Sequence, residues 1–86
     1  MSAAPMNIML GDEAWEGVDA QVQALVDRWL VPEGAQVQAG QPLARVILVK
    51  SSMDIAAPAA GLVERVLVPA GETFGRGQAL AVLKPA

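Results

Sequence analysis

Lys50 is the residue whose type and setting most clearly allow chemistry. It follows a run of apolar, β-favouring residues and precedes two small polar residues, in the stretch Val46-Ile47-Leu48-Val49-Lys50-Ser51-Ser52. This pattern predicts a strand, a tight turn and a second strand, with the amine held out at the tip. The other lysine, Lys84, lies close to the C-terminus, where we expect a solvated and incidental side chain.

The composition removes most other catalytic groups. With no Cys and no His, the chain has no thiol nucleophile, no Ser-His pair, no disulfide and no ordinary zinc site. Ser51 and Ser52 have no base beside them and are predicted to form the turn. Asp54 is a candidate to pair with Lys50 across that turn, a surface contact worth about 0 to 1 kcal/mol. The lysine amine needs a partner enzyme to take its proton, so we expect a chain that is not itself an enzyme.

Length and charge narrow the class of protein. A chain of 86 residues is too short for two independent cores, so we expect one domain spanning 1–86. Hydrophobic residues make up 53% of the chain and aromatic residues 3%, which favours an aliphatic core between closely spaced strands. The net charge of -3, with scattered cations, argues against nucleic-acid binding. We find neither a secretory signal pattern nor an apolar run of membrane-spanning length, and expect a cytoplasmic protein without membrane contact.

An internal repeat organises the elements that must position Lys50. Residues 62–83 align with residues 25–46 at a constant offset of 37, and eleven of the 22 aligned positions are identical. Each half predicts a strand, a turn containing Pro and Gly, a short strand, a glycine corner and a further strand. Two copies of this size cannot be separate domains. We therefore expect two halves of one all-β structure, related by a pseudo-two-fold axis, with Lys50 at their junction.

The repeat also decides between strand and helix for residues 25–31. Apolar residues at helical spacing run through 19–30. The equivalent residues 62–68, however, read as a strand of Val and Leu bounded by Gly and Pro, which predicts a strand in the first half as well. Trp29 is expected to be a core residue, because its repeat partner is Val66.

The N-terminal part lies outside the repeat. Residues 6–10 predict a short first strand ended by Gly11-Asp12. Residues 12–23 read as an acidic loop that Trp15 holds against the body of the domain. The carboxylates of this loop are predicted to form a solvated face or, if they lie beside the lysine, to favour a basic partner surface; they are Asp12, Glu13, Glu16 and Asp19.

These residues resemble the biotinyl/lipoyl attachment (carrier) domain family over residues 6–11 and 25–83. The resemblance rests on Trp29 to Val37, Gly40 to Leu43, Pro58, Gly61, Val68 to Gly71 and Gly77 to Leu80. It implies a flattened barrel, or sandwich, of two small antiparallel sheets with internal pseudo-two-fold symmetry, the barrel-sandwich hybrid. It also implies that a lipoate or biotin ligase acylates Lys50, and that the resulting long arm swings between active sites.

The neighbours of Lys50 leave the cofactor open. In this family lipoyl domains usually have Asp before and Ala after the lysine, and biotinyl domains have Met on both sides, whereas this chain has Val49 and Ser51. Trp29 to Val31 looks more like lipoyl domains of 2-oxo acid or acetoin dehydrogenase complexes. We therefore expect lipoate on Lys50, with acyl groups passing between dehydrogenase and dihydrolipoamide acyltransferase components of a multienzyme complex. The alternatives are a biotin carboxyl carrier with biotinyl-Lys50 and an unmodified, lipoyl-like binding or assembly module.

Overall fold

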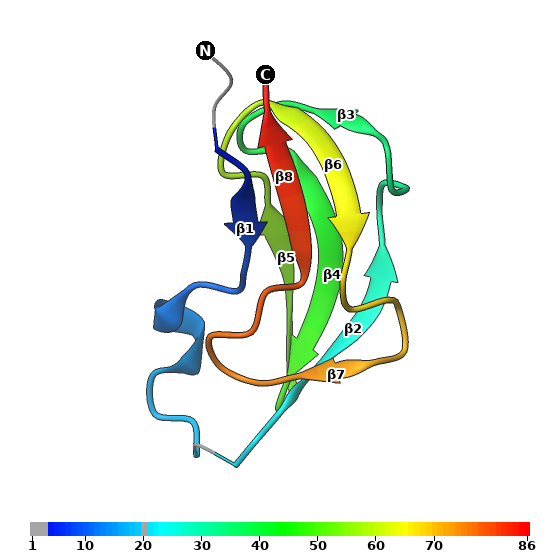
Figure 1. Cartoon of the computed structure of the whole chain (residues 1–86). Helices are drawn as coiled ribbons and strands as arrows, with labels where there is room; N and C mark the ends of the chain where they lie inside the picture. The colour runs from blue at the N-terminus through cyan, green and yellow to red at the C-terminus, as the bar shows by residue number, and fades with distance from the viewer. Residues whose placement is uncertain (1–3, 20) are drawn as a thin grey trace.

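The computed structural model describes residues 4–19 and 21–86, and it confirms the all-β class. Two four-stranded antiparallel sheets form a flattened sandwich, with strand orders β1-β8-β6-β3 and β5-β4-β2-β7 (Figure 1). The strands are β1 (Met6–Ile8), β2 (Ala24–Trp29), β3 (Gln36–Val37), β4 (Pro42–Leu48), β5 (Ser51–Ala56), β6 (Gly61–Val66), β7 (Thr73–Phe74) and β8 (Ala81–Pro85), and a short 3₁₀ helix, η1, covers Asp12–Trp15. In the described part of the chain no helix is long and apolar enough to cross a bilayer.

The two halves exchange their short strands. β3 belongs to the first half but pairs with β6, and β7 belongs to the second half but pairs with β2. The hydrogen bonds of the two glycine turns also cross between the halves. Gly34 N–H donates to the Val63 carbonyl at 2.7 Å, and the equivalent Gly71 N–H donates to the Val26 carbonyl at 2.8 Å. The predicted pseudo-two-fold relation is confirmed, and each half completes the sheet of the other.

The glycine turns take the backbone conformation that the repeat predicts. Gly34 and Gly71, which end the Pro-containing turns, have φ angles of 90° and 88°. Gly40 and Gly77, at the following corners, have φ angles of 82° and 81°. These angles lie in the left-handed region that favours glycine, so both halves turn at the same places for the same reason.

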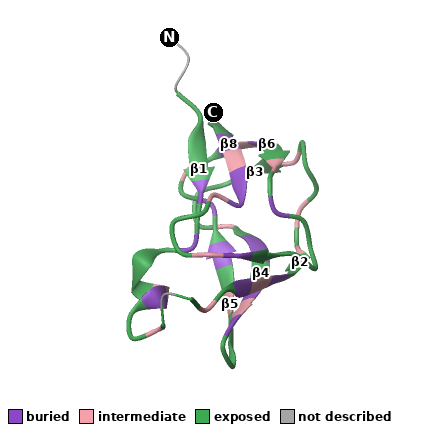
Figure 2. Ribbon diagram, turned by 60° about the horizontal axis from the view of Figure 1, so that its bottom comes forward, coloured by how far each residue is buried: buried purple, intermediate pink, exposed green. Residues whose placement is uncertain are grey.

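Mostly aliphatic side chains fill the core, and Figure 2 shows buried stretches on strands of both sheets. The largest fully buried side chains are Phe74, Ile8, Leu43, Leu80, Leu83, Val26, Val46 and Val63. Trp29 is half-buried and packs against this cluster, and its indole N–H donates to the Val68 carbonyl at 2.9 Å, which ties β2 to the second half. The prediction of a core residue is thus confirmed in part, because Trp29 packs against the buried cluster without being one of its fully buried members.

The N-terminal segment contains helical structure that the sequence did not predict. β1 ends at Ile8, earlier than the predicted strand over 6–10, and η1 follows Gly11. Trp15 lies at the end of η1 with 3% of its surface exposed, and its ring meets that of Phe74 edge to face at a centroid distance of 6.0 Å. The prediction that this tryptophan holds the loop against the body is confirmed.

The long helix considered for residues 19–30 is absent from the described part of the chain, and β2 runs from Ala24 to Trp29. β2 begins one residue and ends two residues earlier than the predicted strand 25–31. β6 differs in the same way from the predicted strand 62–68. Both strands end where the chain turns toward a proline, Pro32 or Pro69. Proline lacks the N–H that would continue the ladder, so the boundary moves toward the N-terminus in both halves.

Candidate functional site

Lys50 is the second residue of a two-residue turn that joins β4 to β5. Leu48 and Ser51 form the last cross-strand pair before the turn, and Lys50 itself is exposed. Figure 1 shows this hairpin at one end of the molecule, with the end of β8 at the opposite end. The predicted position of the amine at a hairpin tip is confirmed.

Buried neighbours hold the hairpin in place. Leu48, directly before the turn, has 3% of its surface exposed, and Val46 and Ile55 are buried further along the two strands. Met53 packs against the same core cluster from β5. The turn therefore extends from a packed sheet by only two residues, so the position of the amine is fixed by rigid elements rather than by a long loop.

The turn has an unusual first residue. Val49 has a φ angle of 62°, and it is the only non-glycine residue with positive φ in the described ranges. Positive φ at the first turn position alone corresponds in sign to a type II′ turn, where glycine is the usual residue. A β-branched side chain in this region is a true outlier. The side chain of Val49 is also 64% exposed, so no burial compensates the strain.

The surroundings of Lys50 leave its ammonium group unpaired. Asp54, which was a candidate partner, lies opposite Arg45 instead, and their Oδ1 and Nε atoms are 3.7 Å apart. Among the described residues, no carboxylate lies within ion-pair distance of Lys50. The prediction that Ser51 and Ser52 form the turn is wrong, because both are the first residues of β5. Two turn residues suffice to reverse the chain.

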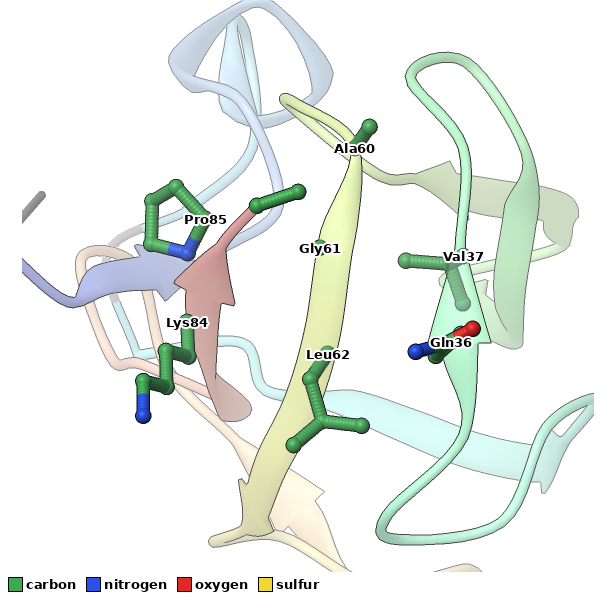
Figure 3. Close-up of a pocket in the computed structure, with 8 residues that line it drawn as sticks. Gln36, Val37, Ala60, Gly61, Leu62, Lys84 and Pro85 are labelled. Atoms are coloured by element: carbon green, nitrogen blue, oxygen red, sulfur yellow. The ribbon is translucent and has the colours of Figure 1, made fainter. Parts of the chain in front are cut away.

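The pocket and the acidic η1 segment lie outside the lysine hairpin. A shallow pocket of about 380 Å³ opens beside β3, β6 and β8, far from the lysine hairpin; among its lining residues are Gln36, Val37, Gly61, Leu62, Lys84 and Pro85 (Figure 3). No group of three or more metal-ligating carboxylates comes together within residues 4–19 and 21–86. In Figure 1 η1 lies in the same half of the molecule as the hairpin, and Asp12 of η1 pairs with Arg76 at 3.5 Å.

This geometry suits the covalent attachment of a carboxylate group. An exposed primary amine that is free of salt bridges can enter the active site of another enzyme and form an amide there. The short, anchored turn presents this amine, and among the described residues no cluster of three or more possible metal ligands lies beside it. A group bound through an amide to Nζ needs no pocket in this chain, and the pocket beside β3, β6 and β8 is lined by residues other than those of the hairpin.

The sequence alone did not reveal two features of the site. Nothing in the sequence predicted the left-handed backbone conformation of Val49, because β-branched residues such as valine rarely adopt it. The strand order of the lysine-bearing sheet, β5-β4-β2-β7, was not predicted either. The repeat aligns each strand with its equivalent in the other half but does not indicate which strands pair.

Comparison with known proteins gives two matches. Residues 16–83 match the profile of the family described as "Biotin-requiring enzyme", which groups biotin and lipoyl attachment domains. A solved structure of a single-chain, multi-domain long-chain acyl-CoA carboxylase is similar over 100% of this chain, with 27% sequence identity and a TM-score of 0.75. The matched part is 8% of that carboxylase, so this chain spans a small fraction of its length. The comparison with curated protein sequences found no match.

Proposed function

Because this chain belongs to the biotin/lipoyl attachment family, we propose that it is a carrier domain in which Lys50 is the site of covalent cofactor attachment. The observation that carries the proposal is the position of Lys50. It lies at the tip of a two-residue hairpin whose strands are anchored in the core, and its ammonium group has no ion-pair partner among the described residues. The other lysine, Lys84, lies within β8 and follows a buried leucine, not a turn.

The attachment reaction requires only an accessible amine from this chain. A base of the modifying enzyme removes a proton from the Lys50 ammonium group, and the freed nitrogen lone pair attacks the activated carboxyl carbon of the cofactor. The bond to the activating group breaks, and that group leaves with the bonding electrons. The nitrogen then loses a second proton to a base of the enzyme or to water, and a neutral amide joins Nζ to the cofactor. The chain contributes the position of Nζ and keeps the backbone of the turn fixed while the enzyme surface approaches.

Biotin is the first candidate for the attached group. The family description refers to enzymes that require biotin, and the similar solved structure is an acyl-CoA carboxylase, a class of enzyme that moves a carboxyl group. Attached biotin would supply a ureido nitrogen that holds the carboxyl group in transit. In this proposal the partners are a biotin ligase and the catalytic domains of a carboxylase, and Lys50 is the anchor from which the arm reaches both.

Lipoate is the second candidate, and it was the first expectation from the sequence. Trp29, Leu30 and Val31 resemble lipoyl domains, and Val49 and Ser51 replace the methionines that usually flank a biotinylated lysine. Attached lipoate would supply a dithiolane that accepts an acyl group when reduced. The partners would then be a lipoate ligase and the dehydrogenase and acyltransferase components of a multienzyme complex.

Intact mass spectrometry separates these candidates. The chain is incubated with ATP and either biotin and a biotin ligase or lipoate and a lipoate ligase. We expect the mass of one biotinyl group to be added in the first reaction, and none to be added to Lys50→Arg. Lys84→Arg is the matched control, because it removes the other lysine with the same conservative change and should be modified as the wild type is.

Three results would change the proposal. Addition of a lipoyl group alone would move the function to the lipoyl carrier. An adduct that survives Lys50→Arg would place the attachment elsewhere. No adduct in either reaction would contradict the carrier function and favour an unmodified binding module.

A further inference from the structure

Side chains alone hold the segment between β1 and η1 and the end of its following turn against the sandwich. We call residues 11–18, which contain η1, the η1 strap. The backbone hydrogen bonds of the strap close within it, since Ala14 N–H donates to the Gly11 carbonyl at 3.1 Å and Val18 N–H donates to the Trp15 carbonyl at 3.1 Å. Among the described residues, no strand pairs with the strap. Its position therefore depends on side-chain contacts.

Trp15 is the main contact of the strap with the core. It is the one buried residue of the strap, with 3% of its surface exposed, and its ring meets that of Phe74. Ala14 and Val18 also pack against the core but are only half-buried. The ion pair between Asp12 and Arg76 joins two exposed side chains, and such pairs contribute little to stability. The docked position of the strap thus depends chiefly on one indole ring.

This indole ring is buried without a partner for its polar atom. Nε1 of Trp15 is the only buried side-chain nitrogen or oxygen in residues 4–19 and 21–86 that has no hydrogen-bond partner. Nε1 of Trp29, by contrast, donates to the Val68 carbonyl at 2.9 Å. A buried N–H without an acceptor costs free energy relative to an N–H in water. Burial of the Trp15 ring therefore favours the docked strap, while its N–H opposes docking.

Charge and backbone entropy also oppose docking. The strap carries Asp12, Glu13 and Glu16, and among the described residues only Asp12 has an ion-pair partner. Like charges held this close repel one another. Gly11 and Gly17 lie on either side of η1, and Gly17 has a φ angle of 75°. Glycine loses more backbone entropy on ordering than any other residue, so both positions are suited to act as hinges.

We propose that the η1 strap undocks as a unit while both sheets stay folded, and that the unpartnered N–H of Trp15 determines how often it does so. In the docked state Trp15 covers part of the Phe74 ring. In the undocked state water accepts the indole hydrogen bond, and the Phe74 ring is open to solvent. Phe74 lies on β7, an edge strand of the lysine-bearing sheet, so the strap controls access to an aromatic ring on that sheet. This inference does not depend on the group attached to Lys50.

Hydrogen exchange in increasing urea tests whether the opening is local. NMR follows exchange of the Trp15 indole N–H and of the Val26 amide, which is buried in β2 and donates to the Glu72 carbonyl. We expect exchange at Trp15 to depend only weakly on urea, because undocking exposes little surface, and exchange at Val26 to depend steeply on urea, because it requires global unfolding. An equally steep dependence at both positions would overturn the local undocking.

A change of one ring atom tests the role of the N–H. In benzothienylalanine a sulfur atom replaces the indole N–H while the shape of the ring is retained. Trp15→benzothienylalanine removes the unpartnered donor, and Trp29→benzothienylalanine is the matched control, because the donor there has an acceptor. Phe74 is the only phenylalanine of the chain, so fluorinated phenylalanine labels this ring alone. Fluorine NMR exchange measurements then give the undocked population in each variant.

We expect the undocked population to fall about tenfold in Trp15→benzothienylalanine, because the docked state no longer contains an unsatisfied donor. Trp29→benzothienylalanine should lower the thermal unfolding midpoint and leave the undocked population within about twofold of the wild type, since it breaks a hydrogen bond outside the strap. An undocked population in the Trp15 variant equal to or above that of the wild type would overturn the role assigned to the N–H.

Discussion

At the scale of single residues, the site depends on two neighbours with opposite properties. Lys50 has a backbone conformation without positive φ and an exposed side chain, while Val49 has a φ angle of 62° and is the least suitable type of residue for it. The hairpin register explains why the strain falls on Val49. Leu48 and Ser51 must pair for the core-facing residues to stay buried, so the first of the two residues between them takes the left-handed conformation.

Val49→Gly is expected to stabilise the fold. A left-handed backbone costs a residue with a side chain about 1 to 3 kcal/mol, and glycine avoids this cost. Glycine also loses more backbone entropy on folding, by about 0.5 to 1 kcal/mol. The free energy of unfolding in urea should therefore rise by about 1 kcal/mol. Val49→Ala keeps a β-carbon and should gain less; a lower unfolding free energy for Val49→Gly would show that the turn is not strained.

At the scale of elements, the two glycine turns are equivalent and should be equally sensitive. Gly34 and Gly71 have nearly the same φ angle, and a β-carbon at either position would have no atom within 4 Å. The cost of a side chain there is therefore conformational rather than steric. It should also be the same in both halves, because each turn donates the same type of hydrogen bond to the opposite half.

Gly34→Val and Gly71→Val are each expected to lower the free energy of unfolding by about 1 to 3 kcal/mol. Urea denaturation followed by circular dichroism gives both values on one scale. Similar losses support two equivalent halves. A lower free energy of unfolding in only one variant would mean that the two turns contribute unequally to stability despite their similar backbone.

One element-level difference between the halves has a steric reason. Ala24 stands where the second half has Gly61. A β-carbon on Gly61 would lie 2.9 Å from the Pro85 Cα atom, because β8 continues alongside it. The pairing of β2 with β4 begins one residue later, at Leu25 and Ile47, so Ala24 has room for its methyl group.

The sequence predicted the fold to the level of strands and turns because both signals are local. Val and Leu residues between Gly and Pro define β6, and the offset of 37 extends the same prediction to β2. The exchange of β3 and β7 between sheets depends on long-range pairing, which a repeat does not specify. The serines after Lys50 were assigned to the turn for the same reason, since only the register of β4 and β5 shows that two turn residues suffice.

At the scale of the whole molecule, the chain is an elongated body of 41 × 21 × 19 Å. The β4–β5 hairpin, whose turn contains Lys50, lies at one end (Figure 1). Reciprocal pairing of β3 with β6 and of β7 with β2 joins the halves into one sandwich. The lysine hairpin is thus an extension of two packed strands and not of a flexible loop. This rigidity is what a carrier needs at the anchor of a long, mobile arm.

The position of the adduct tests this account most directly, because the chain has two lysines and only Lys50 lies in the turn between β4 and β5. The wild-type chain is modified by the ligase that accepts it, cleaved by a protease, and its peptides are sequenced by tandem mass spectrometry. We predict that the added mass lies on Lys50, between Val49 and Ser51, and that Lys84 is unmodified. An adduct on Lys84, or a chain without any adduct after treatment with either ligase, would contradict the assignment of the hairpin tip as the attachment site.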